Sequence, residues 1–477
     1  MMKRLFALVL VLLMIFTLVG CGKSNKREIV KLTLSTEDAE AILAAAGITL
    51  PDAEDTAAAG TVVKYYSWYD PFNNYSEDEI VNTGYFTFTE KYGSSIEWIE
   101  CEWGARFDSL ANLILSGDAP DIFPGEANTF PNQSLKGVFQ SVDDYIDYDD
   151  HLWAGVKDFA DKYFSLNGKH YMFITDVTFG QVCAYNRRVM DEFGFDDPAQ
   201  LYYNDEWTWD VFYNMCLEFT SPDEDRYALD GWGYSSGLMR SCGTMIVNYD
   251  VDASKFVNNI DDPRIERAAT LLYDIAKNGC VYPRWNNGWN LRNATEGAGM
   301  KEGLLLFYIR GTWVFTGTVD EISNIWGDLT EGELMFVPVP RDPNGDGLYY
   351  TETTPTGYCL VKGAENPEGA ALLASCDRFK VLDPTVVSFD RRQLEETYLW
   401  TEEMLSMYDE CYRLANTDNT MVAFDAGYGD KIYNIVGECE GIAGQKEPST
   451  WAQVKEKYSE SLEYYIGELN KQVEEFN

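Results

Sequence analysis

The stretch that decides the fold is VVKYYSWYD, residues 62–70, taken together with the segments that follow it up to residue 123. Its first five residues are mostly β-branched or aromatic, which favours a strand. A helical segment is expected over residues 76–92, ended by Gly93, and a second strand over residues 95–101. A further helical stripe ends at Gly117, before a short apolar strand at 121–123. Strands that alternate with helices predict an α/β fold with a largely parallel sheet.

Helix signals continue to the end of the chain. Asp262 is a favourable N-cap and Pro263 suits a first helical position, so a helix is expected to begin there. Thr450 and Gln453 have the spacing of a capping box, and a long amphipathic stripe follows them. The chain is therefore expected to end in a long helix.

The N-terminus has the layout of a secretory signal. Lys3 and Arg4 precede an apolar run over residues 5–20, which is too short and wrongly flanked for a spanning helix. The run ends in Leu-Val-Gly before Cys21, and this ending resembles the lipobox of bacterial lipoproteins, whose cysteine is acylated before cleavage. A plain signal peptide or a short membrane helix is the alternative interpretation.

The segment after the signal is polar, acidic and alanine-rich. We expect residues 1–21 to be the signal peptide and lipobox, and residues 22–61 to be a flexible tether with at most a short helix over 36–46. Acyl chains on Cys21 would anchor the protein to the outer face of the cell membrane, outside the cytoplasm.

The charge balance limits the kinds of partner. The chain has 78 acidic and 37 basic residues and a formal charge of −41, which disfavours nucleic acid and anionic lipid surfaces as partners. By the same argument, though weaker, a neutral ligand fits better than a phosphate-rich or carboxylate-rich one. The ten cysteines include no Cys-x-x-Cys pair and the two histidines have no partner at metal-ligand spacing, so no metal or other cofactor is expected.

Eight segments, taken in order, resemble the extracellular solute-binding proteins of carbohydrate ABC transporters. They are VVKYYSWYD at 62–70, FTEKYG at 88–93, SGDAPDIF at 116–123, LNGKHYMFITD at 166–176, AYNRRVMDEFG at 184–194, WTWDVF at 207–212, FYIRGTWVF at 307–315 and TWAQVKEKY at 450–458. The resemblance covers about residues 62–475 and implies a two-lobed, type II periplasmic-binding-protein-like fold. It also implies a monomeric receptor, without catalysis, that delivers a mono- or oligosaccharide to the permease subunits of an ABC importer.

The same resemblance implies how the chain divides between lobes. Residues 62–176 and 357–416 are expected to form lobe 1, and residues 177–356 and 417–477 to form lobe 2. The chain would cross between the lobes at three places and the lobes would close over the sugar. The expected crossings are residues 176–181, 353–358 and 416–424.

The residues that follow the first three strands are candidates for the ligand site. In an open α/β sheet the ligand crevice lies beyond the carboxyl ends of the strands. A pyranose has an apolar C–H face and a rim of hydroxyls, so its site needs flat aromatic rings and polar groups. The candidates on this side are Trp68, Tyr69, Asp70, Trp103, Glu126 and Asn128, with the neighbouring Glu102 less favoured.

The opposite side of the cleft should carry a second set. It comprises Asp176 at the first crossing, Trp232 between two glycines, and Arg310 and Trp313 in the Gly-x-Trp segment, with Trp285 and Trp289 as further options. The remaining tryptophans singled out by their strand or helix patterns are expected in the core, namely Trp98, Trp153, Trp207, Trp209 and Trp451.

One motif resembles half of a calcium loop. Asp342-x-Asn344-x-Asp346-Gly347 has the alternating oxygens and the turn glycine of an EF-hand, but the twelfth position is Thr353 and not glutamate. The same residues make a strong turn between two strand-like segments. A turn without a metal ion is the favoured interpretation.

Two other classes of function remain open from the sequence. A membrane-anchored glycoside hydrolase would need two carboxylates facing each other across the sugar bond, and the acidic residues could supply such a pair. A glycan-binding adhesion lipoprotein would more often be rich in β-structure. Bond cleavage against reversible binding separates the first class from a receptor.

The lipid anchor is testable by one substitution. Cys21→Ser removes the thiol that would be acylated, so the protein should leave the membrane fraction, because the acyl chains supply the anchoring energy. Fractionation with a carbonate wash measures this. Protein that stays membrane-bound after the substitution contradicts the lipoprotein interpretation.

Overall fold

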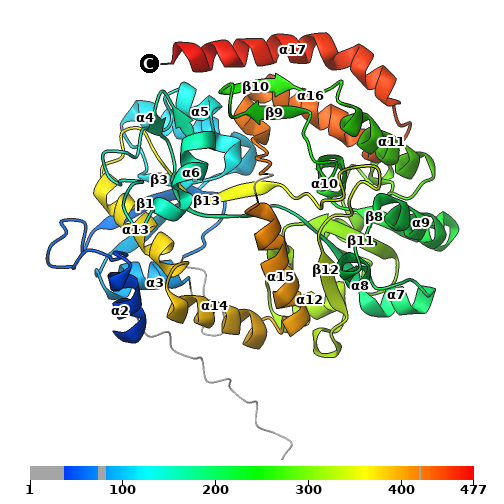
Figure 1. The fold of residues 1–477 in the computed structure, drawn as a ribbon, viewed down its shortest axis with the longest axis horizontal. Coiled ribbons are helices and arrows are strands. Elements are labelled where there is room, and N and C mark those ends of the chain that lie inside the picture. Colours follow the sequence, from blue (N-terminus) through cyan, green and yellow to red (C-terminus); the bar gives the residue numbers. More distant parts are fainter. Residues whose placement is uncertain (1–36, 73–81, 418–419, 477) are drawn as a thin grey trace, which may run out of the picture.

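Two mixed β-sheets, each flanked by helices, form the body of the protein (Figure 1). A computed structural model describes residues 37–72, 82–417 and 420–476. Cys21 and the predicted signal lie outside these residues. Within the described ranges, no helix combines the length and the apolar character needed to cross a membrane.

The first sheet has the strand order β2-β1-β3-β13-β6. Its strands are β1 (Val62–Ser67), β2 (Ser95–Glu100), β3 (Ile122–Pro124), β6 (Phe173–Phe179) and β13 (Thr353–Leu360). β1 runs parallel to β2 and β3, whereas β13 runs antiparallel to both β3 and β6. The three strands predicted from residues 62–123 are confirmed, including their order along the chain.

The second sheet has the order β12-β7-β11-β8. Its strands are β7 (Val182–Asn186), β8 (Tyr227–Asp230), β11 (Leu305–Arg310) and β12 (Leu334–Val337). β11 is parallel to β8, but β7 is antiparallel to β11 and β12. The expectation of mainly parallel sheets is therefore wrong. β7 and β13 each follow a strand of the other sheet along the chain, and each pairs antiparallel with its neighbours.

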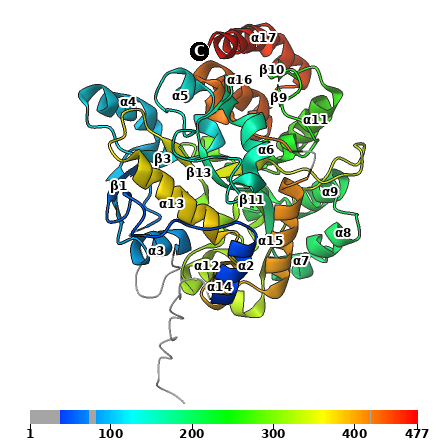
Figure 2. The ribbon, with the colours of Figure 1, turned by 60° about the vertical axis from the view of Figure 1, so that its left-hand side comes forward.

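Helices cover both sheets (Figures 1 and 2). Around the first sheet lie α3 (Thr83–Glu90), α4 (Arg106–Ser116), α5 (Asn132–Leu135), α6 (Ala154–Tyr163), α13 (Pro367–Lys380) and α14 (Pro384–Glu396). Around the second lie α7 (Arg187–Phe193), α8 (Pro198–Tyr203), α9 (Trp209–Phe219), α10 (Tyr234–Arg240), α11 (Pro263–Lys277) and α12 (Val319–Trp326). α15 (Glu402–Ala415) contacts strands of both sheets, β6 and β12.

The C-terminal helix α17 (Trp451–Glu475) lies across the top of the molecule in Figure 1. It packs on α16 (Asp430–Glu440) and on the hairpin of β9 (Val247–Asp250) and β10 (Lys255–Asn258). The capping box of Thr450 and Gln453 is present, as predicted. The predicted start of α11 is confirmed too, with the Asp262 side chain accepting a hydrogen bond from the Arg264 backbone N–H at 2.8 Å.

The chain passes directly from one sheet to the other at two places, and the segment predicted as a third crossing is hydrogen-bonded to the second. β6 is followed by Gly180 and Gln181 and then by β7, so the first crossing is a two-residue connection. The second crossing enters β13 at Thr353. The third follows α15, and Thr353 binds it twice, through its backbone N–H to the Met421 carbonyl at 2.7 Å and through its hydroxyl to the Ala415 carbonyl at 2.8 Å.

Part of the segment expected to be a tether is folded. α2 (Glu37–Ala45) confirms the short helix predicted there, and the residues after it pack on the first-sheet half of the molecule. Leu50 and Ala58 are buried, and the Tyr92 hydroxyl donates a hydrogen bond to the Pro51 carbonyl at 2.7 Å. From residue 48 onward this segment therefore belongs to the globular body, because its apolar side chains find a surface that covers them.

His170 on the surface of the first half is held between two carboxylates. Its Nδ1 lies 2.6 Å from Asp143 Oδ1 and its Nε2 lies 2.7 Å from Asp161 Oδ1. Burial lowers the pKa of His170, but the hydrogen bonds to Asp143 and Asp161 outweigh it, so the pKa is raised above its ordinary value of 6.5. The imidazolium form is thus stabilised in the folded state.

The stability that His170 supplies should depend on pH. Because the folded-state pKa is raised, the contribution is fully present below pH 6.5 and is lost as the pH rises through the folded-state pKa. His170→Gln should therefore lower the free energy of unfolding at pH 5.5 by only about 1 kcal/mol, because solvent screens these partly exposed pairs. At pH 9 the loss should be smaller, because the contribution of the imidazolium falls as the pH rises. Urea denaturation of both proteins at the two pH values measures this. An equal loss at both values contradicts it.

Candidate ligand-binding cleft

Two adjoining hollows lie between the halves of the molecule. One has a volume of about 680 Å³ and is lined almost entirely from the second-sheet half. The other has a volume of about 300 Å³ and is lined by loops of the first-sheet half and by residues 352–357. Both hollows are lined by Glu352 and Asp425, so they meet there. We call the two hollows together the cleft.

Three of the predicted residues line the first-half wall of the cleft. Tyr69 follows β1, and Glu126 and Asn128 follow β3, as the post-strand argument predicts. Asn128 Nδ2 donates a hydrogen bond to Glu126 Oε2 at 2.5 Å. Burial raises the pKa of Glu126 above 4.5, against the opposing effects of Asn128 and Arg106.

The second-half wall carries three exposed tryptophans. Trp232, Trp289 and Trp313 line the larger hollow and are 52%, 55% and 58% exposed. Trp289 has φ of 65°, a left-handed conformation that a bulky residue rarely adopts and that tends to occur at ligand sites. These rings present apolar faces to the cleft without being needed to fill a core.

Arginines stack on two of these rings. The guanidinium carbon of Arg284 lies 4.2 Å from the Trp232 ring centroid, and that of Arg310 lies 5.2 Å from the Trp313 ring centroid. Both arginines line the same hollow as the rings. Cation–π contact at these distances fixes the orientation of each indole.

Two predicted tryptophans lie outside the cleft. Trp68 and Trp103 do follow β1 and β2, but their rings pack edge to face at 4.3 Å and line neither hollow. Arg106 of α4 stacks over the Trp103 ring at 3.7 Å, which leaves Trp103 47% exposed. These two residues therefore form a separate aromatic group beside Tyr69.

Two predicted carboxylates serve the backbone and the crossings. Asp70 Oδ1 accepts a hydrogen bond from the Phe72 backbone N–H at 2.9 Å, which forms a turn after β1. Asp176 in β6 accepts a hydrogen bond from the Tyr412 hydroxyl of α15 at 2.7 Å. Neither lines the cleft. Trp285, named as an option, does not line it either.

The floor of the cleft is a buried ionic network that sequence reasoning missed. Arg240 of α10 is bonded to Glu352, to Asp425 at 2.7 Å, and to both oxygens of Glu440 at 3.1 and 3.2 Å. Burial lowers the pKa of Arg240, but the three carboxylates outweigh it and raise the pKa. Burial also raises the pKa of Glu440. The three carboxylates lie 112, 185 and 200 residues along the chain from Arg240, so no local sequence signal marks the network.

The C-terminal part of the chain adds further residues that the sequence did not indicate. Tyr433 and Glu438 on α16, and Gln445 after it, line the larger hollow. Burial lowers the pKa of Arg106, and both Glu126 and Tyr433 act against this. The amphipathic pattern of residues 430–440 could have marked the helix, but nothing in it marks the face that meets a ligand.

Two buried acceptors at the cleft have no partner among the described residues. They are Oε1 of Gln181 at the first crossing and Oδ1 of Asn128. Buried polar atoms are nearly always hydrogen-bonded, and each is costly when it is not. Both atoms are therefore suited to accept hydrogen bonds from a ligand that carries hydroxyl groups.

The tryptophans expected in the core are placed as predicted, with one exception. Trp153, Trp207, Trp209 and Trp451 are buried. Trp98 is only partly buried, and its Nε1 donates a hydrogen bond to the Ser67 carbonyl at 3.2 Å. Position within a strand or helix pattern thus separates core tryptophans from cleft tryptophans in this chain.

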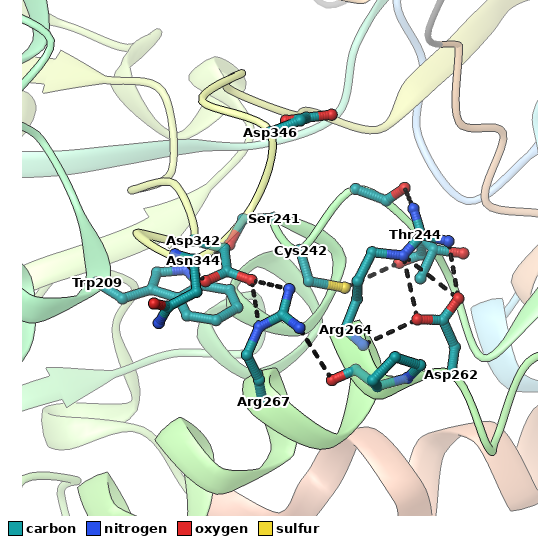
Figure 3. Close-up of polar contacts among 12 residues, drawn as sticks. Trp209, Ser241, Cys242, Thr244, Asp262, Arg264, Arg267, Asp342, Asn344 and Asp346 are labelled. Carbon is teal, nitrogen blue, oxygen red and sulfur yellow. Dashed lines mark hydrogen bonds and ion pairs between the residues drawn. The ribbon is translucent and has the colours of Figure 1, made fainter.

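The residues of the calcium-like motif form a turn and do not converge. Figure 3 shows Asp346 apart from Asp342 and Asn344. Asp342 Oδ2 accepts hydrogen bonds from Arg267 Nε at 2.8 Å and Nη2 at 2.6 Å, and Asp346 pairs with the Tyr350 hydroxyl. In the part of the chain that the structure describes, no three His, Cys, Asp or Glu side chains gather as a metal site would require.

The sequence profile of the bacterial extracellular solute-binding proteins matches residues 86–376. The chain belongs to this family. Membership indicates an extracytoplasmic location. No curated protein matches the chain.

Solved structures share the fold along most of the chain. An ABC substrate-binding protein of Listeria monocytogenes, in complex with cycloalternan, has 17% identity and a TM-score of 0.59, over 87% of this chain and 99% of its own. A receptor of Streptomyces glaucescens, solved unliganded and with acarbose, has 13% identity and a TM-score of 0.58, over 87% and 99%. The lacto-N-biose-binding protein of Bifidobacterium longum has 14% identity and a TM-score of 0.58, over 86% and 99%. The two-lobed, type II solute-binding fold is thereby confirmed.

Cleft and core tryptophans should differ in their effect on stability. Trp313→Ala removes an exposed ring, so the melting temperature should stay near that of the parent. Trp207→Ala leaves a cavity at a fully buried position and should lower the free energy of unfolding by about 3–5 kcal/mol. Thermal unfolding of the two variants measures this. If Trp313→Ala destabilises the protein as much as Trp207→Ala, Trp313 is part of the packing and not of a ligand site.

Proposed function

We propose that this protein is a lipid-anchored receptor that captures a carbohydrate in the cleft and delivers it to an ABC importer. Cys21 would hold it to the outer face of the cell membrane, and the permease subunits of the importer would be its protein partner. The single observation that carries the proposal is that three exposed tryptophans, Trp232, Trp289 and Trp313, line one wall of the cleft.

The chemistry of the cleft suits a sugar. Indole rings offer flat apolar faces to the C–H face of a pyranose. The carboxylate of Glu126 and the two unpartnered acceptors, Gln181 Oε1 and Asn128 Oδ1, can bind sugar hydroxyl groups. A volume of about 680 Å³ for the larger hollow is within the range of small-molecule sites. Several solved relatives of the same fold were crystallised with sugars, which supports the same class of ligand here.

Closure of the two halves over the sugar is the proposed mechanism. Residues of the predicted crossings line the cleft, so small backbone changes there would rotate one half against the other. A ligand that touches both walls binds the closed state more tightly and shifts the population toward it. The closed state would then be the form that the permease recognises.

A sugar panel tests the receptor against the enzyme alternative. Incubation with mono- and oligosaccharides should raise the melting temperature for at least one sugar without cleaving any bond, because a ligand that binds only the folded state stabilises it. The same sugar should reduce the radius of gyration in solution scattering, and Trp313→Ala should weaken its binding at least tenfold by calorimetry.

Three results would overturn the proposal. Glycosidic cleavage by the purified protein would favour a hydrolase. A scattering profile that does not change at saturating sugar would contradict closure. The absence of any stabilising sugar across the panel would remove carbohydrate as the ligand class.

A further inference from the structure

Two arginines in the larger hollow make no hydrogen bond to a carboxylate among the described residues. Arg310 is the last residue of β11, and Arg284 begins the short 3₁₀ turn that follows β8 and α11 in the chain. The closest carboxylate oxygen is 3.6 Å from Arg284 Nε, on Asp230, and 3.7 Å from Arg310 Nη2, on Glu296. Both distances exceed those of a charge-assisted hydrogen bond.

The two neighbouring carboxylates are engaged by other donors. Asp230 Oδ1 accepts from the Gly231 backbone N–H at 2.8 Å, and its Oδ2 accepts from the Arg292 backbone N–H at 2.9 Å. Glu296 Oε2 accepts from the Tyr308 hydroxyl. Burial raises the pKa of both carboxyls. Asp230 and Glu296 therefore leave most of the hydrogen-bonding capacity of the two guanidinium groups unused.

Specific donors on each arginine lack a partner. Among the described residues, Nη1 of Arg284 and Nε of Arg310 are buried and have none. Tyr234 lies beside Arg284, and burial raises its pKa while Arg284 acts in the opposite direction. A guanidinium has five N–H donors, and a buried one without acceptors is costly. Arg240 in the same hollow is the contrast, since three carboxylates saturate it.

Each of these arginines lies against a cleft tryptophan. Arg284 stacks on Trp232 and Arg310 on Trp313. Both arginines also line the larger hollow, so a sugar held there would have the two guanidinium groups among its neighbours. A negatively charged substituent on that sugar, and not a hydroxyl alone, would use both the charge and the paired donors of the fork.

We propose that the cleft selects a saccharide bearing a carboxylate, a uronic acid or an oligosaccharide that contains one, through Arg310 and Arg284 beside the tryptophan platforms. This inference rests on the proposed function and names its substrate class. The planar carboxylate matches the planar guanidinium fork with two parallel hydrogen bonds. Four carboxylates line the same hollow, those of Glu352, Asp425, Glu438 and Glu440. Because they repel a doubly charged phosphate more than a singly charged carboxylate, the singly charged group is favoured.

Calorimetry with matched sugars tests this. Glucuronic and galacturonic acids and their disaccharides are compared with glucose, galactose and the corresponding neutral disaccharides on the full chain. The best acidic sugar should bind at least tenfold more tightly than its neutral counterpart, and this preference should shrink as salt is added. Arg310→Gln should lower the affinity for the acidic sugar at least tenfold more than the affinity for the neutral sugar. Arg310→Lys should retain part of the preference for the acidic sugar.

Arg341→Gln is the matched control. Arg341 also lies near a carboxylate, 3.2 Å from Asp205, and near an aromatic ring, 5.6 Å from that of Tyr349, but it does not line the cleft. Its substitution should leave the preference unchanged. Arg310 is preferred to Arg284 for the test because it is partly exposed, and thermal unfolding of each variant verifies that it is folded.

Each other outcome has a distinct meaning. The carboxylate inference would be overturned if neutral sugars bind as tightly as acidic ones, or if Arg310→Gln lowers the affinity for both equally. The proposal of a sugar receptor would then still stand. Tighter binding of sugar phosphates or sulfates than of uronic acids would overturn the choice of carboxylate. If no sugar of any kind binds, the proposed function itself fails.

Discussion

The pairing of β6 with β13 is the constraint on which the rest of the structure depends. These strands carry the first two crossings, and their register sets where both halves begin. The pairing shifts at Gly357, whose φ is 142° and where an added Cβ would lie 1.8 Å from the Phe173 carbonyl oxygen. Only glycine permits so close an approach of the two backbones. The shift also lets Gly125 donate its N–H to the Gly357 carbonyl at 2.7 Å, which places the loop carrying Glu126 at the cleft.

The buried Arg240 network completes what the strand pairing begins. Glu352 directly precedes β13, Asp425 follows the third crossing, and Glu440 ends α16, so one guanidinium joins three segments. Removing one partner of such a network leaves a buried charge uncompensated, which is strongly destabilising. The floor of the cleft is therefore held by the same contacts that hold the crossings together. Motion of the halves, as proposed, would have to take place around this fixed point.

Net charge and local charge lead to different conclusions about the ligand. A formal charge of −41 over the whole chain favours a neutral ligand, since an acidic protein repels anions at long range. Within the cleft, however, Arg284 and Arg310 retain donors without carboxylate partners. At hydrogen-bonding distance, local donors outweigh a diffuse surface charge that salt screens beyond about 10 Å. The ligand class thus depends on which few charges the fold brings to one wall.

By itself, the sequence determined the local elements and the family. The β-rich run at 62–66, the proline and aspartate before α11 and the capping box before α17 act through neighbouring backbone groups, so they could be recognised without the fold. Tyr69, Glu126 and Asn128 could be predicted because residues after parallel strands share one edge of a sheet. The mixed strand directions, the exclusion of Trp68 and Trp103 from the cleft, and the gathering of Arg240 with Glu352, Asp425 and Glu440 were decided by the tertiary structure. The partners of Arg240, for example, lie 112 to 200 residues away along the chain, and contacts at such separations leave no periodicity or spacing in the sequence.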